Sequence, residues 1–373
     1  MNFPASMPSQ RHRPTGEFQM KRLLTLPLLF LLSGCQELAE FNDFVDSIES
    51  GEFTAQSLLS ANPSSDFRNS GQVVLSVGER IGPDAKVQTR DSFGQWSECR
   101  RRGHTPRGGA PVNAFTVLVD GSGSMELEYF NGECDTCPHD PGRERVGAAR
   151  RFVWKVQDVA PRSDLFLGEF GPTPHPEMLA TRILSDFTDS SEHAEASVDQ
   201  LMGYEPVGTP LWDSLGEMIE ETAIARQNLN RETGEDVGSA IVILSDGQDN
   251  QSTYFDLDSV SREAIAAGVP IFAIGLGPAS ASAWDPEAYG DQQTNTVLDL
   301  QRVAQRTGGF YSSVDEPGRL YDLFDAVADG LAEGYTEETY ECWEGGSAPA
   351  SGSLVEGRIL SGNSELPWFF LAP

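Results

Sequence analysis

Residues 115–124 read Phe-Thr-Val-Leu-Val-Asp-Gly-Ser-Gly-Ser, and this stretch decides the fold. Its first five residues are apolar or β-branched, and a run of this length and composition is typical of a buried strand. The run ends at Asp120, after which Ser122 and Ser124 alternate with glycines. Because glycine lacks a Cβ atom, such a loop can turn tightly and direct its three oxygen-bearing side chains at one point. Ligands bind at this end of the strands in open α/β sheets, so the stretch predicts a ligand site, with a plain Asp-Gly and Ser-Gly turn as the alternative.

The chain is strongly acidic and long enough for one large domain with appendages or for two domains. Its 373 residues carry a formal net charge of −31, and the sequence pI is about 4.3. Nucleic acids bind through Lys and Arg contacts to phosphates, so this charge argues against a nucleic-acid partner. The charge favours a soluble, self-repelling surface and is compatible with binding of divalent cations.

The amino-terminal segment predicts export and a lipid anchor. Two basic residues precede an apolar run, residues 23–32, which is too short to cross a bilayer and has the layout of a secretory signal that starts at Met20. The run closes with Leu-Ser-Gly-Cys, which resembles the lipobox of bacterial lipoproteins. That resemblance implies cleavage before Cys35, acylation of this cysteine and anchoring in a membrane. Gln36 in the second mature position favours the outer membrane of a Gram-negative bacterium, and an ordinary leader with an incidental cysteine is the alternative.

Strand and helix patterns alternate after the opening stretch. Short apolar runs predict strands, and apolar positions three and four residues apart predict helices between them. The predicted strands are 113–119, 165–170, 181–184, 239–244, 270–276 and 309–312. The predicted helices are 143–159, 191–202, 211–226, 257–267, 295–306 and 317–332. Almost entirely apolar strands are buried on both faces, so the sequence predicts an α/β fold with a doubly wound, mostly parallel sheet and helices on both faces.

The segments around this alternation differ from it in composition. The predicted organisation is a leader (1–34), a lipid-anchored acidic segment with a linker and short strands (35–111), the α/β domain (112–335) and a carboxyl-terminal extension with two more strands (336–373). Residues 50–70 are rich in Ser, Asn and Gly and predict the linker. Residues 99–111 contain three consecutive arginines and predict a basic loop that leads into the first core strand.

Three loops bring oxygen ligands to one edge of the predicted sheet. They are the loop after the first core strand, the turn that contains Thr209 and the Ser-Asp-Gly turn that contains Asp246. Because the carboxyl ends of parallel strands share one edge, we expect two carboxylates and three hydroxyls to meet there. Oxygen ligands without His or Cys favour Mg²⁺ first, with Ca²⁺ or Mn²⁺ as alternatives. Two carboxylates leave an octahedral shell incomplete, so one position stays open for an outside ligand.

These motifs resemble the metal-ion-dependent adhesion site (MIDAS) of the von Willebrand factor A (VWA) domain family. The Asp-x-Ser-x-Ser loop, the distant Thr and the second Asp occur in the family's order within residues 112–335. The resemblance implies that these five residues hold the cation: Asp120, Ser122, Ser124, Thr209 and Asp246. It also implies that an exposed carboxylate of a protein partner completes the shell, and that a shift of helix 317–332 alters how Thr209 and Asp246 contact the ion. The loop 126–142 is longer than the family's usual passage at this point.

Four cysteines remain once the lipidated residue is set aside. An even number in an exported chain indicates two disulfides, for which three pairings exist. The ends of a VWA domain lie close together, so the resemblance implies a Cys99–Cys342 bridge and leaves Cys134 to pair with Cys137. The alternative for the second pair is a zinc or redox element that includes His139.

The predicted function is that of a cell-envelope lipoprotein whose VWA domain binds a protein partner through a divalent cation. A metal-free structural module on the envelope is one alternative, and a hydrolase is another. Ser122 and Ser124 do not lie in a Gly-x-Ser-x-Gly elbow, and the five histidines fall in the leader or in loops. The sequence therefore predicts no enzyme activity.

Overall fold

The computed structural model describes residues 58–126, 139–171, 180–201, 208–283, 285–314, 319–344, 347–362 and 364–373. The predicted leader, the lipidation residue Cys35 and the pair Cys134 and Cys137 lie outside these residues. The chain divides into two units, Met1–Ser50 and Gly51–Pro373, and all the described residues belong to the second. None of the helices formed by these residues is long and apolar enough to cross a membrane.

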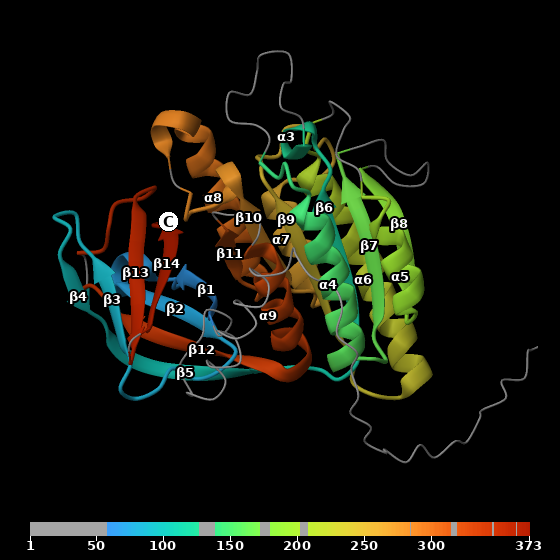
Figure 1. The fold of residues 1–373 in the computed structure, drawn as a ribbon, viewed down its shortest axis with the longest axis horizontal. Coiled ribbons are helices and arrows are strands. Elements are labelled where there is room, and N and C mark those ends of the chain that lie inside the picture. Colours follow the sequence, from blue (N-terminus) through green and yellow to red (C-terminus); the bar gives the residue numbers. More distant parts are fainter. Residues whose placement is uncertain are drawn as a thin grey trace, which may run out of the picture. The chain divides into compact units, whose positions relative to one another are not determined.

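A six-stranded sheet in the order β11-β10-β9-β6-β7-β8 lies at the centre of the second unit (Figure 1). Its strands are β6 (Asn113–Asp120), β7 (Asp164–Phe170), β8 (Thr181–Thr188), β9 (Gly238–Ser245), β10 (Ile271–Leu276) and β11 (Tyr311–Val314). All neighbouring pairs are parallel except β7 and β8, which are antiparallel. The chain runs from β6 to one side of the sheet and then returns to the other side at β9. The boundary between β6 and β9 is therefore the topological switch point, where open α/β sheets bind ligands.

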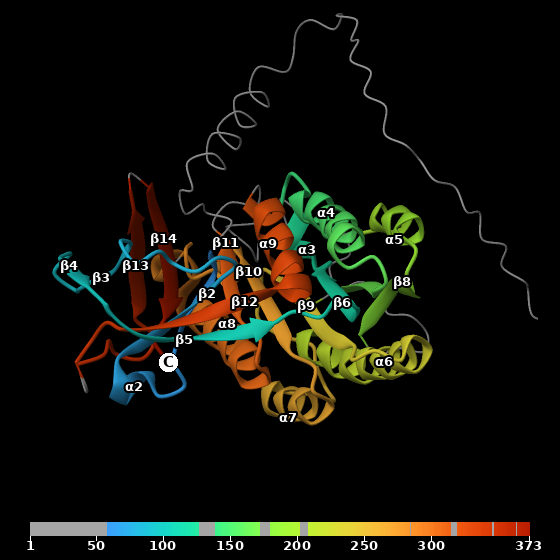
Figure 2. The same ribbon diagram turned by 90° about the horizontal axis from the view of Figure 1, so that it is seen from below.

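Helices cover both faces of this sheet (Figure 2). One face carries α4 (Glu144–Val159), α5 (Ser191–Val198) and α9 (Leu320–Glu333), and the other carries α6 (Leu211–Thr233), α7 (Leu257–Ala267) and α8 (Pro286–Thr307). The side chains of β6 alternate between the two faces of the sheet. Val117 and Val119 pack into the first core and Leu118 packs into the second. The predicted fold class is confirmed.

The flanking segments form two antiparallel four-stranded sheets with the orders β1-β2-β12-β5 and β14-β13-β3-β4. The first contains β1 (Leu58–Pro63), β2 (Gln72–Val77), β5 (Arg100–Gly108) and β12 (Gly334–Glu341). The second contains β3 (Lys86–Arg90), β4 (Trp96–Glu98), β13 (Leu354–Ser361) and β14 (Ser364–Leu371), and a short helix, α2 (Phe67–Ser70), precedes β2. The two sheets contribute to one apolar cluster that includes Leu75, Tyr340 and Phe370. Strand β12 begins directly where α9 ends, so this extension is continuous with the last helix of the central domain.

Two predictions about the flanking segments are wrong. Residues 58–63, placed in the linker, form β1, and residues 100–108, placed in a basic loop, form β5. Strand β5 lies at the edge of its sheet and exposes most of its side chains, so it lacks the apolar alternation that predicts a strand. Its arginines instead form ion pairs with three glutamates of the neighbouring strand β12: Glu337, Glu338 and Glu341.

Boundaries also differ within the central domain. Helix α6 continues to Thr233 rather than to 226, and α8 begins at Pro286 rather than at 295. The expected bridge between Cys99 and Cys342 is present, with the two Cα atoms 4.3 Å apart. It joins the residue before β5 to the residue after β12, and these two strands are neighbours in their sheet. Because β12 follows α9 directly in the chain, the bridge ties the strand that continues α9 to its neighbour.

Candidate functional site

Asp120, the last residue of β6, lies at the switch point of the sheet and is fully buried. Its Oδ1 accepts a hydrogen bond from the backbone N–H of Ser122 (2.8 Å), and its Oδ2 accepts one from Ser245 Oγ (2.7 Å). The next residue, Gly121, donates its N–H to the carbonyl of Phe170 at the end of β7 (2.7 Å). Three neighbouring strands, β6, β7 and β9, therefore fix the loop and its carboxylate.

A chain of oxygens connects this loop to the turn after β9. Ser122 Oγ lies 3.0 Å from Ser124 Oγ, and Ser124 Oγ donates to Oδ1 of the buried Asp246 over 3.0 Å. Adjacent ligands of an octahedral ion with bonds of about 2.1 Å lie roughly 3 Å apart. The spacing of these three oxygens thus fits the coordination shell of a small divalent cation. In the part of the chain that the structure describes, no three His, Cys, Asp or Glu side chains form a metal-binding group, so cation binding here depends on the hydroxyls.

Thr209 lies beside the same turn. A Cβ atom added at Gly247 would be 3.9 Å from Thr209 Oγ1, which places this hydroxyl next to the residue that follows Asp246. The backbone of Thr209 is held by Asn250: its N–H donates to Asn250 Oδ1 (2.7 Å), and its carbonyl accepts from the Asn250 N–H (3.1 Å). The structure therefore brings four of the five predicted ligands into one hydrogen-bonded chain and sets the fifth beside it.

Asp213, in the first turn of α6, holds the loop after β9 in place. This buried carboxylate accepts hydrogen bonds from the backbone N–H groups of Thr253 (2.8 Å), Tyr254 (3.0 Å) and Phe255 (2.8 Å). Three backbone N–H groups on one carboxylate fix the position of the loop relative to α6. Nothing in the sequence distinguishes Asp213, since an acidic residue in the first turn of a helix is ordinary.

The electrostatics of the site favour a bound cation. Burial, and then the negative charge of Asp246, raise the pKa of Asp120 to about 7, although hydrogen bonds from Ser122 and Ser245 oppose the change. Two buried carboxylates that repel each other are unfavourable without a compensating positive charge. A divalent cation among these oxygens would supply that charge, and perturbed carboxylates of this kind are typical of functional sites.

His139 belongs to the site, although the sequence analysis grouped it only with the Cys134 and Cys137 pair. Its Nδ1 lies 2.6 Å from Oδ2 of Asp246, and only 6% of its side chain is exposed. Its backbone N–H donates to the carbonyl of Ser124 (3.0 Å). The signal in the sequence was its position near the end of the loop 126–142, shortly before the predicted helix 143–159.

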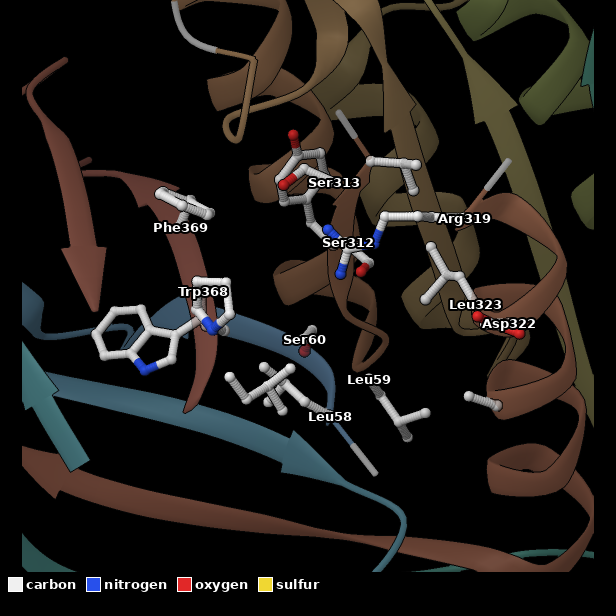
Figure 3. Close-up of a pocket in the computed structure, with 16 residues that line it drawn as sticks. Leu58, Leu59, Ser60, Ser312, Ser313, Arg319, Asp322, Leu323, Trp368 and Phe369 are labelled. Atoms are coloured by element: carbon white, nitrogen blue, oxygen red, sulfur yellow. The ribbon is translucent and has the colours of Figure 1, made fainter. Parts of the chain in front are cut away.

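A cavity of about 100 Å³ lies apart from the predicted ligands (Figure 3). It is lined by β1, β11, β14 and the first turns of α9, with Leu58, Ser312 and Trp368 among the lining residues. The cavity contains none of the five predicted ligands, so it is not part of the candidate metal site.

Residues 176–326 match the family model of the von Willebrand factor type A domain. No curated protein matches the chain. Among solved structures, proximal thread matrix protein 1 from the mussel byssus aligns with 13% identity and a TM-score of 0.39 over 63% of this chain and 50% of its own length. The SpRpn10 VWA domain aligns with 16% identity and a TM-score of 0.35 over 57% of this chain and 93% of that domain.

An aerotolerance-related membrane protein from Bacteroides fragilis aligns with 14% identity and a TM-score of 0.35, over 58% of this chain and 98% of its own. One structure of the mussel protein is described as having a zinc-occupied MIDAS motif. The present chain spans about half the length of the mussel protein.

Proposed function

We propose that this chain, whose residues 176–326 match the family model of the von Willebrand factor type A domain, binds a protein partner through a divalent cation held at its MIDAS-like site. The observation that carries the proposal is the chain of oxygens from Ser122 through Ser124 to Asp246, with spacings of 3.0 Å, beside the buried carboxylate of Asp120. The two carboxylates would supply charge, and the hydroxyls, including that of Thr209, would supply neutral ligands. An exposed carboxylate of the partner would complete the shell.

Magnesium is the first choice of ion, with Mn²⁺ or Ca²⁺ as alternatives. The ligand set consists of hard oxygens, which these cations prefer. Mg²⁺ demands near-octahedral geometry and usually keeps water in part of its shell, so an outside carboxylate can displace a water. The bound cation would act as a Lewis acid towards that carboxylate, and the proposed role includes no enzymatic step.

We further propose that the protein acts on the cell envelope, anchored by acyl chains on Cys35 in the outer membrane. The lipobox resemblance of the Leu-Ser-Gly-Cys segment supports the anchor. The Cys99–Cys342 disulfide supports an oxidising compartment, because such bridges persist mainly in exported proteins. Globomycin, which inhibits lipoprotein signal cleavage, should cause a larger, uncleaved form to accumulate, and an unchanged mass would contradict the anchor.

A metal-free structural module is the second candidate, and one observation favours it. The imidazole of His139 lies 2.6 Å from Oδ2 of Asp246, so one oxygen of this carboxylate has a protein partner of its own. In that case the domain would serve as a scaffold on the envelope, and chelators would not alter its interactions.

Isothermal titration calorimetry with Mg²⁺ and Mn²⁺ separates the two candidates. The wild type should release or absorb heat on binding, and Asp120→Ala should show none while keeping its helical circular dichroism. Asp158→Ala, which removes an exposed carboxylate on α4, is the matched control and should bind like the wild type. A pull-down from the native envelope, with and without chelator, then tests the partner: capture that is unaffected by chelator would favour the scaffold.

A further inference from the structure

His139 is held beside Asp246 by several fixed contacts. The residue that follows it, Asp140, donates its N–H to the carbonyl of Met125 (2.8 Å) and forms a fully buried ion pair with Arg145 (2.8 Å). Asp140 also accepts the backbone N–H of Glu144 (2.8 Å) at the start of α4. The backbone next to His139 is therefore attached both to the predicted metal loop and to the first turn of α4.

The imidazole ring also has a close neighbour at the end of β10. It packs against Gly277, the residue after β10, where a Cβ atom would lie 3.0 Å from His139 Cγ. Gly277 has a φ of 55°, a conformation that favours glycine, so this position leaves room for the ring. A side chain enclosed in this way has little freedom to turn away from Asp246.

The two oxygens of Asp246 have different partners. Oδ1 accepts from Ser124 Oγ and so faces the hydroxyls of the metal loop, whereas Oδ2 lies 2.6 Å from His139 Nδ1. A carboxylate can only accept at this position, so the ring N–H is the donor. The hydrogen bond therefore fixes the rotation of the carboxylate and directs Oδ1 towards the place where the cation would bind.

We propose that His139 is a positioning residue of the cation site, which holds Asp246 by its Nδ1–H so that Oδ1 is presented to the ion. The inference rests on the proposed function, because it requires that the site binds a cation. Hydrogen bonds from residues that do not touch the metal orient its ligands, and their loss typically weakens metal affinity 10- to 100-fold. His139, which lies shortly before α4 in the chain, would thus set the affinity of the site for the cation.

The test measures Mn²⁺ affinity of the full chain by the electron paramagnetic resonance signal of free Mn²⁺ at fixed pH. His139→Ala should weaken binding about 10- to 100-fold. His139→Asn keeps an N–H donor where Nδ1 stands and should bind close to the wild type. His139→Gln moves the donor one bond farther and should resemble the alanine variant. His104→Ala removes an exposed histidine of β5 and should change nothing.

Thermal unfolding in chelator shows whether each variant folds. If His139→Ala does not fold, the comparison of Mn²⁺ affinity between His139→Asn and His139→Gln tests the proposal. Wild-type affinity in His139→Ala, or equal affinities in the Asn and Gln variants, would overturn the positioning role and leave the proposed function intact. Strong coupling of a directly bound ¹⁴N to Mn²⁺ in electron spin echo spectra would show coordination by the ring and would also overturn it. Equal Mn²⁺ binding by wild type and Asp120→Ala, or none by either, would refute the proposed function itself.

Discussion

The substitution Asp120→Asn should stabilise the metal-free protein while it abolishes cation binding. Asp120 is fully buried and lies close enough to Asp246 for the second carboxylate to raise its pKa. Asparagine has nearly the same shape, can accept the N–H of Ser122 and can donate to Ser245 Oγ. It therefore keeps the local contacts and removes the buried negative charge.

The magnitude follows from the pKa of Asp120, which rises from 3.8 to about 7 on folding. A difference of about three units corresponds to about 4 kcal/mol. Because the pKa is raised, the folded protein binds the proton more strongly than the unfolded chain, so this contribution to stability is present at low pH and is lost as the pH rises towards 7. We expect Asp120→Asn to exceed the wild type by about 2–4 kcal/mol at pH 8, and to differ little from it near pH 4.

Urea unfolding in chelator, followed by circular dichroism at several pH values, measures this difference. Added Mg²⁺ at 1,000 times its dissociation constant should cancel or reverse the difference at pH 8, because it stabilises the folded state by about 4.1 kcal/mol and only the wild type binds it. Parallel pH profiles for the two proteins, or a variant that is less stable at pH 8 in chelator, would refute the reasoning.

Three other variants test the site and the structure that supports it. Asp140→Ala should lower the free energy of unfolding by about 3–5 kcal/mol in urea, because it removes the carboxylate of a fully buried ion pair with Arg145. The double variant Cys99→Ser/Cys342→Ser should lower it by up to about 5 kcal/mol, since the bridge spans 243 residues, and should change partner affinity if the bridge restrains α9; an unchanged affinity would count against that restraint. Thr209→Ala should weaken Mn²⁺ binding in calorimetry less than Asp120→Ala does, because Thr209 would supply a neutral ligand and Asp120 a charge. A complete loss of binding in Thr209→Ala would contradict this order.

The central sheet could be predicted because its strands are buried on both faces. Residues 113–120 are all buried, and the sequence shows a run of apolar and β-branched residues, 115–119, that ends sharply at Asp120. The same is true of β10, whose six residues are all buried. Because a strand buried on both faces needs apolar residues, its burial can be predicted from the residue types alone. The oxygen-bearing residues that follow each strand then indicate the edge of the sheet where ligands bind.

The flanking strands β1 and β5 could not be predicted in the same way. The identity of β5 as a strand depends on its partner β12, because its arginines meet glutamates across the ladder and bury little surface of their own. Strand β1 is well buried, but its Leu-Leu-Ser-Ala-Asn-Pro sequence has no alternation that separates it from a linker. These elements form through long-range pairing, which a local pattern does not record.

The candidate site was predicted as a set of ligands but not as a network. The hydroxyls and carboxylates follow from a motif, whereas Asp213 and His139 act through tertiary contacts with residues far along the chain. In the sequence, His139 had a role only in the alternative of a zinc or redox element with the nearby cysteines, whereas the structure places its ring against Asp246. Residues that orient the ligands without touching the ion do not occur at a characteristic spacing in the sequence.

The most direct test of the central claim is an anomalous difference map from crystals of the wild-type protein soaked in Mn²⁺. We predict a single strong peak at bonding distance from Ser122 Oγ, Ser124 Oγ and a carboxylate oxygen of the site, and no such peak in crystals of Asp120→Ala. A wild-type map without density between these side chains would contradict the account.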